Sequence, residues 1–134
     1  MSKRTFYIAF SAVVILFSMF ACEFSASTAN IDEAVMARDP EGEQPTTVFG
    51  PNDVFYCVVD LANAPDDTTV RAEWTAVNVE GVDPNTAIDQ TELTTGSGEL
   101  NFELSNTSAW PSGAYKVDLY LNGELDRTLE FTVQ

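Results

Sequence analysis

The sequence has 134 residues, in which six lysines and arginines stand against 21 aspartates and glutamates, and histidine is absent. A chain of this length forms one domain once a leader is removed, and a domain of about 100 residues can bury a usable core. From Cys22 onward four basic residues remain against all 21 acidic ones, a side-chain charge of −17, and such a polyanion is repelled by nucleic acid and by anionic lipid surfaces, which argues against both as partners.

Residues 1–21 have the three parts of an export signal. Lys3 and Arg4 give a basic start, residues 6–20 form an uncharged apolar run, and the small Ala21 precedes Cys22. The run is somewhat shorter than the roughly 20 apolar residues that span a bilayer. These features predict an apolar signal helix, a signal peptide over residues 1–21 and export of the chain that follows.

Residues 19–22, Met-Phe-Ala-Cys, resemble the lipobox of bacterial lipoproteins, in which a small residue precedes an obligatory cysteine. The resemblance implies that the Cys22 thiol receives a diacylglyceryl group, that Cys22 becomes the mature N-terminus, and that the protein is anchored to the outer face of a bacterial membrane. Two acyl chains suffice for this, because each buried methylene contributes about 0.8 kcal/mol. An uncleaved signal anchor and ordinary secretion stay open as alternatives; without lipidation, Cys22 could form a disulfide with Cys57.

Residues 22–30 are small, polar and aperiodic, which predicts a flexible tether and places the domain at residues 31–134. Residues 31–38 fit either a short helix by propensity or a first strand that turns Val35 and Ala37 inward. The turn residues Asp39 to Gly42 follow directly, and they favour the strand.

The middle of the chain predicts three strands. Residues 46–49 are short and β-prone. Residues 54–61 are apolar up to Asp60, as in a central strand covered on both faces, and residues 69–77 alternate as in a strand with one buried face. The predicted inward residues are Phe55, Cys57, Val59 and Leu61 in the first long strand and Val70, Ala72, Trp74 and Ala76 in the second.

Two shorter segments follow. Residues 88–93 have a poorly specified register, which predicts an edge strand, whereas Leu100, Phe102 and Leu104 alternate with polar residues as in a half-buried strand. Between them, residues 96–98 (Gly-Ser-Gly) predict a hairpin turn. Because no helix follows this turn, it does not form a phosphate-binding P-loop.

The last two strands form the clearest element. Residues 115–121 alternate between apolar and polar side chains, and Asn122-Gly123 then supplies the strongest short signal for a type I′ hairpin turn. The predicted apolar face of the return strand consists of Leu125, Leu129, Phe131 and Val133.

The whole pattern gives about seven short strands with no helix after the leader, which predicts an all-β, two-sheet antiparallel sandwich or a small barrel. Cys57, Trp74, Tyr115 and Val117 resemble the signature of immunoglobulin domains, which have the first cysteine, the core tryptophan, the corner tyrosine and the second cysteine at these places. The resemblance implies an immunoglobulin-like sandwich. Since Val117 is not a cysteine, no inter-sheet disulfide forms, and Cys57 is expected to be a buried, inert thiol.

The chain from Phe49 onward is also similar to the immunoglobulin-like domains of bacterial envelope lipoproteins. Three features carry this likeness: Asn-Ala-Pro at residues 63–65, the strand around Trp74, and Trp-Pro-x-Gly-x-Tyr at residues 110–115. The likeness implies a domain displayed in the cell envelope. A shared sandwich fold implies no particular activity.

No catalytic residues are predicted. Without histidine there is no triad base and no Cys/His nucleophile, and a sandwich of this size offers little cleft for a pair of carboxylates. No cofactor is expected apart from calcium, for which oxygen-rich positions are the weak candidates, although solvated acidic loops are the commoner explanation. These candidates are Asp66, Asp67, Asp83, Asn85 and Asp89.

Three aromatic residues could form a binding surface. Tyr56 and Tyr120 point away from the predicted core faces of their strands, and Trp110 precedes a proline. Exposed aromatic rings can stack on sugars or anchor a protein, although packing at the end of the sandwich is the commoner role for a residue such as Trp110. The sequence thus predicts a non-enzymatic surface or envelope lipoprotein that displays one domain for adhesion, ligand binding or contact with a protein or glycan partner. A structural spacer or assembly subunit of the envelope and an acidic calcium-dependent module are the alternatives.

Overall fold

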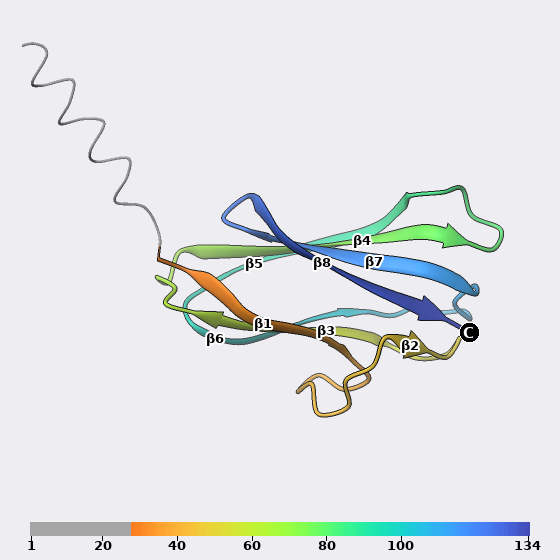
Figure 1. The fold of residues 1–134 in the computed structure, drawn as a ribbon, viewed down its shortest axis with the longest axis horizontal. Helices are drawn as coiled ribbons and strands as arrows, with labels where there is room; N and C mark the ends of the chain where they lie inside the picture. The colour runs from red at the N-terminus through yellow and green to blue at the C-terminus, as the bar shows by residue number, and fades with distance from the viewer. Residues whose placement is uncertain (1–27) are drawn as a thin grey trace, which may run out of the picture.

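A computed structural model describes residues 28–134, which form two stacked β-sheets (Figure 1). The predicted two-sheet, all-β architecture is confirmed. Within the described residues, no helix has the length and apolarity needed to cross a membrane. The predicted signal peptide, Cys22 and the first part of the predicted tether lie outside the described residues. The first strand begins at Asn30, one residue before the predicted start of the domain.

The smaller sheet has the strand order β1-β3-β6 and the larger one the order β2-β8-β7-β4-β5. The smaller sheet contains β1 (Asn30–Ala37), β3 (Phe55–Ala62) and β6 (Gly98–Leu104). The larger sheet contains β2 (Val48–Phe49), β8 (Glu124–Val133), β7 (Gly113–Leu121), β4 (Thr68–Val79) and β5 (Thr86–Thr95). Every strand pair is antiparallel except β2 and β8, which run parallel. The prediction that residues 88–93 form an edge strand is confirmed by β5.

The core lies between the sheets and follows the alternation of β3 and β4. Phe55, Cys57 and Val59 have no exposed surface, and Trp74 is 1% exposed. At one end of the sandwich the interior is aromatic: the Phe55 ring stacks on Trp110 with 4.6 Å between ring centroids, and the Trp74 ring lies edge-on to Phe131 at 6.0 Å. The side chains removed from water here supply the main force that holds the two sheets together.

The segment before β7 closes this aromatic end. The Tyr115 hydroxyl donates a hydrogen bond to the Pro111 carbonyl (2.6 Å), and the Trp110 indole N–H donates to the Asp53 carbonyl (3.0 Å). A tyrosine whose hydroxyl bonds a few residues back at the start of this strand is the tyrosine corner of immunoglobulin sandwiches. Gly113 has φ +150°, and a Cβ there would lie 2.4 Å from the Asn78 carbonyl oxygen, so only glycine fits.

Two β-bulges overturn predicted orientations. In β1 the register shifts between Ile31 and Glu33, so Met36, and not Val35, packs in the core. In β8 the register shifts opposite Leu119 and Tyr120, and Leu125 consequently pairs with the outward-facing Tyr120 and is 57% exposed. Each bulge inserts one residue and thereby inverts the alternation beyond it. The predicted inward positions of Val35 and Leu125 are therefore wrong.

The predicted hairpin turn at residues 96–98 is also wrong. β5 belongs to the larger sheet and β6 to the smaller one, so this segment carries the chain from one sheet to the other. The local sequence contains the glycines of a tight turn, but strand partners are chosen by tertiary packing. By contrast, the predicted β7–β8 hairpin is confirmed, and Asn122 and Gly123 both have the positive φ that its turn requires.

Candidate binding groove between β1 and β8

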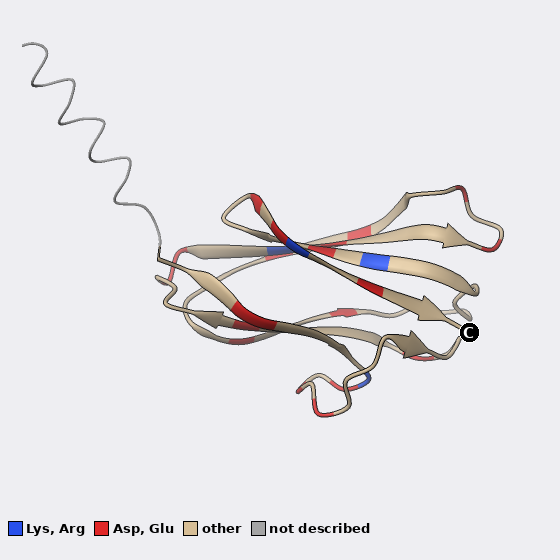
Figure 2. Cartoon of the chain, viewed as in Figure 1, with Lys and Arg blue, Asp and Glu red and all other residues tan. Residues whose placement is uncertain are grey.

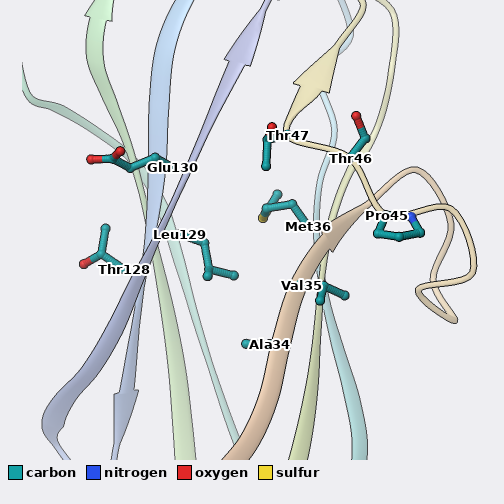
Figure 3. A pocket seen from close by; sticks show the side chains of 9 residues that line it. All are labelled: Ala34, Val35, Met36, Pro45, Thr46, Thr47, Thr128, Leu129 and Glu130. Carbon is teal, nitrogen blue, oxygen red and sulfur yellow. The ribbon is translucent and has the colours of Figure 1, made fainter.

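A groove of about 570 Å³ opens along the edge of the sandwich where β1 and β8 face each other (Figure 3). Met36 and Leu129 extend into the space between the two strands and form an apolar floor, whereas Thr128 and Glu130 project from the other side of β8. The groove is lined by Ala34, Val35, Met36, Pro45, Thr46, Thr47, Thr128, Leu129 and Glu130.

The groove exists because the chain changes sheets after β1. β1 pairs with β3 in the smaller sheet, residues 38–47 loop outward, and the two residues of β2 then pair only with Thr132 and Val133 of β8. Asp39 holds this loop through its carboxylate, which accepts hydrogen bonds from the Glu43 N–H (2.9 Å) and the Gln44 N–H (2.7 Å). Partial desolvation works to raise the pKa of Asp39, but these backbone hydrogen bonds outweigh it and leave the pKa below its ordinary value.

Part of the β8 edge has no strand beside it. The Thr132 N–H donates to the Thr47 carbonyl at 2.8 Å and thus points away from β7. Successive residues of an antiparallel strand direct their backbone N–H and C=O groups to opposite sides. The backbone groups of Glu130 and Thr128, two and four residues before Thr132, therefore also point away from β7. β2 pairs with β8 only at Thr132 and Val133, so these groups face the groove. Within the described residues, no strand pairs with them.

The facing edge of β1 is similar. The Met36 carbonyl accepts a hydrogen bond from the Thr46 N–H (2.9 Å) on the side away from β3, so the backbone groups of Ala34, two residues earlier, point to the same side. Next to Thr128, the Arg127 guanidinium donates to the Ile31 carbonyl at 2.6 Å and thereby connects β8 to β1 directly. The groove is therefore a short slot with backbone hydrogen-bonding groups on both walls.

Of the described residues that line the groove, Glu130 is the one that is charged, and acidic segments outnumber basic ones on both sheets (Figure 2). On the outer face of the smaller sheet, Glu33 pairs with Asp60, and Asp60 pairs with Glu99. These carboxylates and Glu41 line a hollow of about 140 Å³ that shares Val35 with the groove. Like charges directly opposite each other destabilise a sheet, and no lysine or arginine is present in β1, β3 or β6 to offset them.

All four basic side chains of residues 28–134 already have acidic partners. Their ion pairs are Arg38–Asp53 (3.6 Å), Arg71–Glu73 (2.7 Å), Lys116–Asp118 (3.3 Å) and Arg127–Asp126 (2.7 Å). Residues 28–134 thus contain 20 acidic side chains against these four basic ones, of which Lys116 also lies opposite Glu130 in the β7–β8 pair.

The calcium candidates do not form one site. Asp66 and Asp67 precede β4, and Asp83 and Asn85 follow it, so the 12 residues of that strand separate the two pairs. At about 3.3 Å per residue, this distance far exceeds the 2.3–2.6 Å of calcium coordination. Among residues 28–134, no group of three acidic or thiol side chains is placed to hold a metal ion. Asn85 has φ +57°, a turn conformation that asparagine tolerates well, which accounts for this residue without a ligand.

The immunoglobulin-like signature residues lie in the interior. Cys57 and Val117 are fully buried, and Trp74 and Tyr115 nearly so. Burial raises the pKa of the Cys57 thiol to about 12, which leaves it protonated and unreactive at neutral pH. Val117 lies opposite Trp74 in the β4–β7 pair. These four residues therefore build the core and offer no reactive group to a ligand.

The three aromatic candidates do not share a surface. Trp110 is only 8% exposed. Tyr120 lies on the outer face of the larger sheet, where the Arg71 guanidinium sits 4.2 Å from its ring centroid, whereas Tyr56 belongs to β3 of the smaller sheet. A continuous aromatic platform for a sugar is therefore not formed by these residues.

Sequence reasoning missed the groove and its lining residues. The groove depends on how far β2 extends along β8, and only the tertiary arrangement decides that. The one local signal was the pair of turn clusters, at residues 39–42 and 50–53, that leave only a short strand between them. Such a short strand cannot cover the whole edge of a partner as long as β8.

No protein-family model matches the sequence, and no curated protein matches it at a significant level. Solved structures are similar in fold. An immunoglobulin-like protein from Pseudomonas aeruginosa matches with a TM-score of 0.55 and 16% identity, over 81% of this chain and 98% of that one. An alkylpurine DNA glycosylase from Pseudomonas fluorescens, solved bound to DNA with an abasic-site analogue, matches with a TM-score of 0.53 and 17% identity, over 82% of this chain and 31% of that one. At these identities the likeness extends to the fold alone, and residues 28–134 form an immunoglobulin-like β-sandwich.

Proposed function

We propose that the chain is an exported, lipid-anchored, non-enzymatic binding module of the bacterial cell envelope, whose groove between β1 and β8 receives a protein partner. The observation that carries this proposal is the uncovered stretch of β8 beside an apolar floor. Soluble proteins usually shield such edges, because unpaired backbone groups attract other strands. An edge left open next to a slot of this size is therefore best explained as a place for another protein.

Site-specific photo-crosslinking in the native cell tests the binding role. We expect a photoreactive amino acid at Thr47, an exposed residue of the groove, to give a light-dependent adduct of defined mass. The matched control is Thr94, an exposed residue of β5 at the opposite edge of the same sheet, and it should give none. If neither position gives an adduct, or both give the same one, the groove is not the binding site and a structural spacer becomes the better explanation.

The anchor is tested separately. Mass spectrometry of the mature protein is expected to show an N-terminal Cys22 whose thiol carries a diacylglyceryl group, as the lipobox-like residues 19–22 imply. A Cys22→Ser variant removes the acceptor thiol and should keep the leader attached. A free Cys22 thiol in the mature wild-type protein would defeat the anchor proposal but would leave the groove proposal intact.

A further inference from the structure

We propose that the segment bound in the groove is an extended strand of the partner protein that carries lysine or arginine side chains and pairs with the free edge of β8. This inference deepens the proposed function and rests on it. It specifies the mode of binding, backbone pairing, and the charge of the bound segment.

β2 shows that the edge of β8 can accept a strand. This strand already pairs with β8, through hydrogen bonds from Thr132 to Thr47 (2.8 Å) and from Gln134 to Phe49 (3.0 Å). The edge of β8 is thus shaped to accept a strand, and β2 occupies only its last residues. An added strand placed before β2 would bond the outward backbone groups of Thr128 and Glu130, and such main-chain bonds supply affinity in strand addition.

The two sides of the slot favour different side chains of a bound strand. Successive side chains of an extended strand point to opposite sides. One side of a strand in the groove would face the apolar floor of Met36 and Leu129, and the other would face water and the carboxylate of Glu130. Alternating apolar and basic residues fit these two environments.

The charge of the chain disfavours a second copy of itself as the occupant of the groove. Residues 28–134 contain 20 acidic and four basic side chains, and each of the four basic ones already has an acidic partner. Two copies would bring like charges together, and like-charge juxtaposition disfavours an interface. A basic segment would instead be attracted by the net negative charge of the chain and would add a cationic partner to Glu130, which already lies opposite Lys116 in the β7–β8 pair.

A synthetic peptide probe tests the inference on the full chain in a non-ionic detergent. The probe is a nine-residue peptide in which lysines alternate with valines. Its first control replaces the lysines by glutamates, and its second keeps the lysines but carries an N-methyl group on every backbone amide nitrogen, which blocks strand pairing at both edges of the peptide. We expect the probe alone to slow hydrogen exchange of the Thr128 and Glu130 amides, with no change at the outer-edge amides of β5.

Two variants at Glu130 separate charge from backbone. Glu130→Gln keeps the N–H and removes the charge, so the affinity for the probe should fall about two- to fivefold. Glu130→Pro removes a backbone N–H that points outward and does not bond β7, and an edge strand tolerates proline at such a position. The affinity for the probe should then fall about tenfold or more, because a backbone hydrogen bond to the probe is lost. Unchanged exchange at the Leu129 and Phe131 amides in the free variants shows that the β7–β8 pair is retained.

The outcomes are distinct. Basic strand addition is overturned if the N-methylated and plain lysine peptides bind equally well. It is also overturned if the glutamate peptide protects the Thr128 and Glu130 amides, or if the chain self-associates through these amides. If Thr47 still gives its crosslink in cells, the groove remains the binding site and only the mode of binding proposed here fails. If that crosslink is absent, the proposed function itself fails.

Discussion

Replacing Gly113 by alanine is expected to lower the free energy of unfolding by about 3 kcal/mol or more. Gly113 has φ +150°, and an added Cβ would lie 2.4 Å from the Asn78 carbonyl oxygen and 2.7 Å from the Val79 Cα. Both are backbone atoms of β4 and have little freedom to move. The backbone conformation costs about 1–3 kcal/mol for a residue other than glycine, and the overlap with β4 adds a similar amount.

Urea-induced unfolding of Gly113→Ala measures this effect, and Gly81→Ala is the matched control. Gly81 also has a positive φ (+76°), but an added Cβ there meets nothing within 4 Å. The control should therefore lose only the conformational part, about 1 kcal/mol. Equal losses in the two variants would contradict the close approach of β7 to β4, and with it the register that places Tyr115 at the corner.

Replacing Trp74 by alanine is expected to cost about 3–5 kcal/mol, because a large buried ring is removed and a cavity is left. Trp74 is 1% exposed, lies opposite Val117, and has its ring edge-on to Phe131 at 6.0 Å. The side chain therefore contacts the core from the middle of the larger sheet.

Leu125→Ala is the control for Trp74→Ala, since Leu125 is 57% exposed and its removal should change stability by less than about 0.5 kcal/mol. Both variants are compared with wild type by chemical unfolding at one temperature. A loss below about 1 kcal/mol for Trp74→Ala would mean that the ring is not packed between the sheets.

The sequence predicted most strands because their two faces differ in polarity. β3, β4 and β7 have runs in which every second side chain enters the core, and the hairpin turn at Asn122-Gly123 has a specific backbone requirement. Signals of this kind are local and need no knowledge of the partner strand. The tyrosine corner belongs to the same group, since Tyr115 and Pro111 are close in sequence.

The errors arose where a partner strand decides the outcome. The bulges at the start of β1 and β8 invert the alternation of side chains beyond them. As a result Met36, and not Val35, packs in the core, and Leu125 is exposed to solvent. The glycines at residues 96–98 permit a tight turn, but they do not specify whether the next strand joins the same sheet. The sequence also could not show that the calcium candidates before and after β4 are separated by the 12 residues of that strand.

The groove could not be predicted for a related reason. It is bounded by β1 from one sheet and β8 from the other, and its walls carry backbone groups whose direction depends on strand pairing. The pattern of apolar and polar side chains in the sequence does not indicate which backbone groups are left without a neighbouring strand. The proposed binding role therefore depends on three-dimensional pairing, whereas the proposed anchor at Cys22 depends on sequence alone.

Hydrogen exchange of the β8 amides in the free protein tests the open edge most directly. We expect slow exchange at the Leu129 and Phe131 amides, which bond β7, and at the Thr132 amide, which bonds Thr47. We expect fast exchange at the Thr128 and Glu130 amides. Protection of Thr128 and Glu130 as strong as that of Leu129 would show that the edge is already covered, and a binding groove at this place would be contradicted.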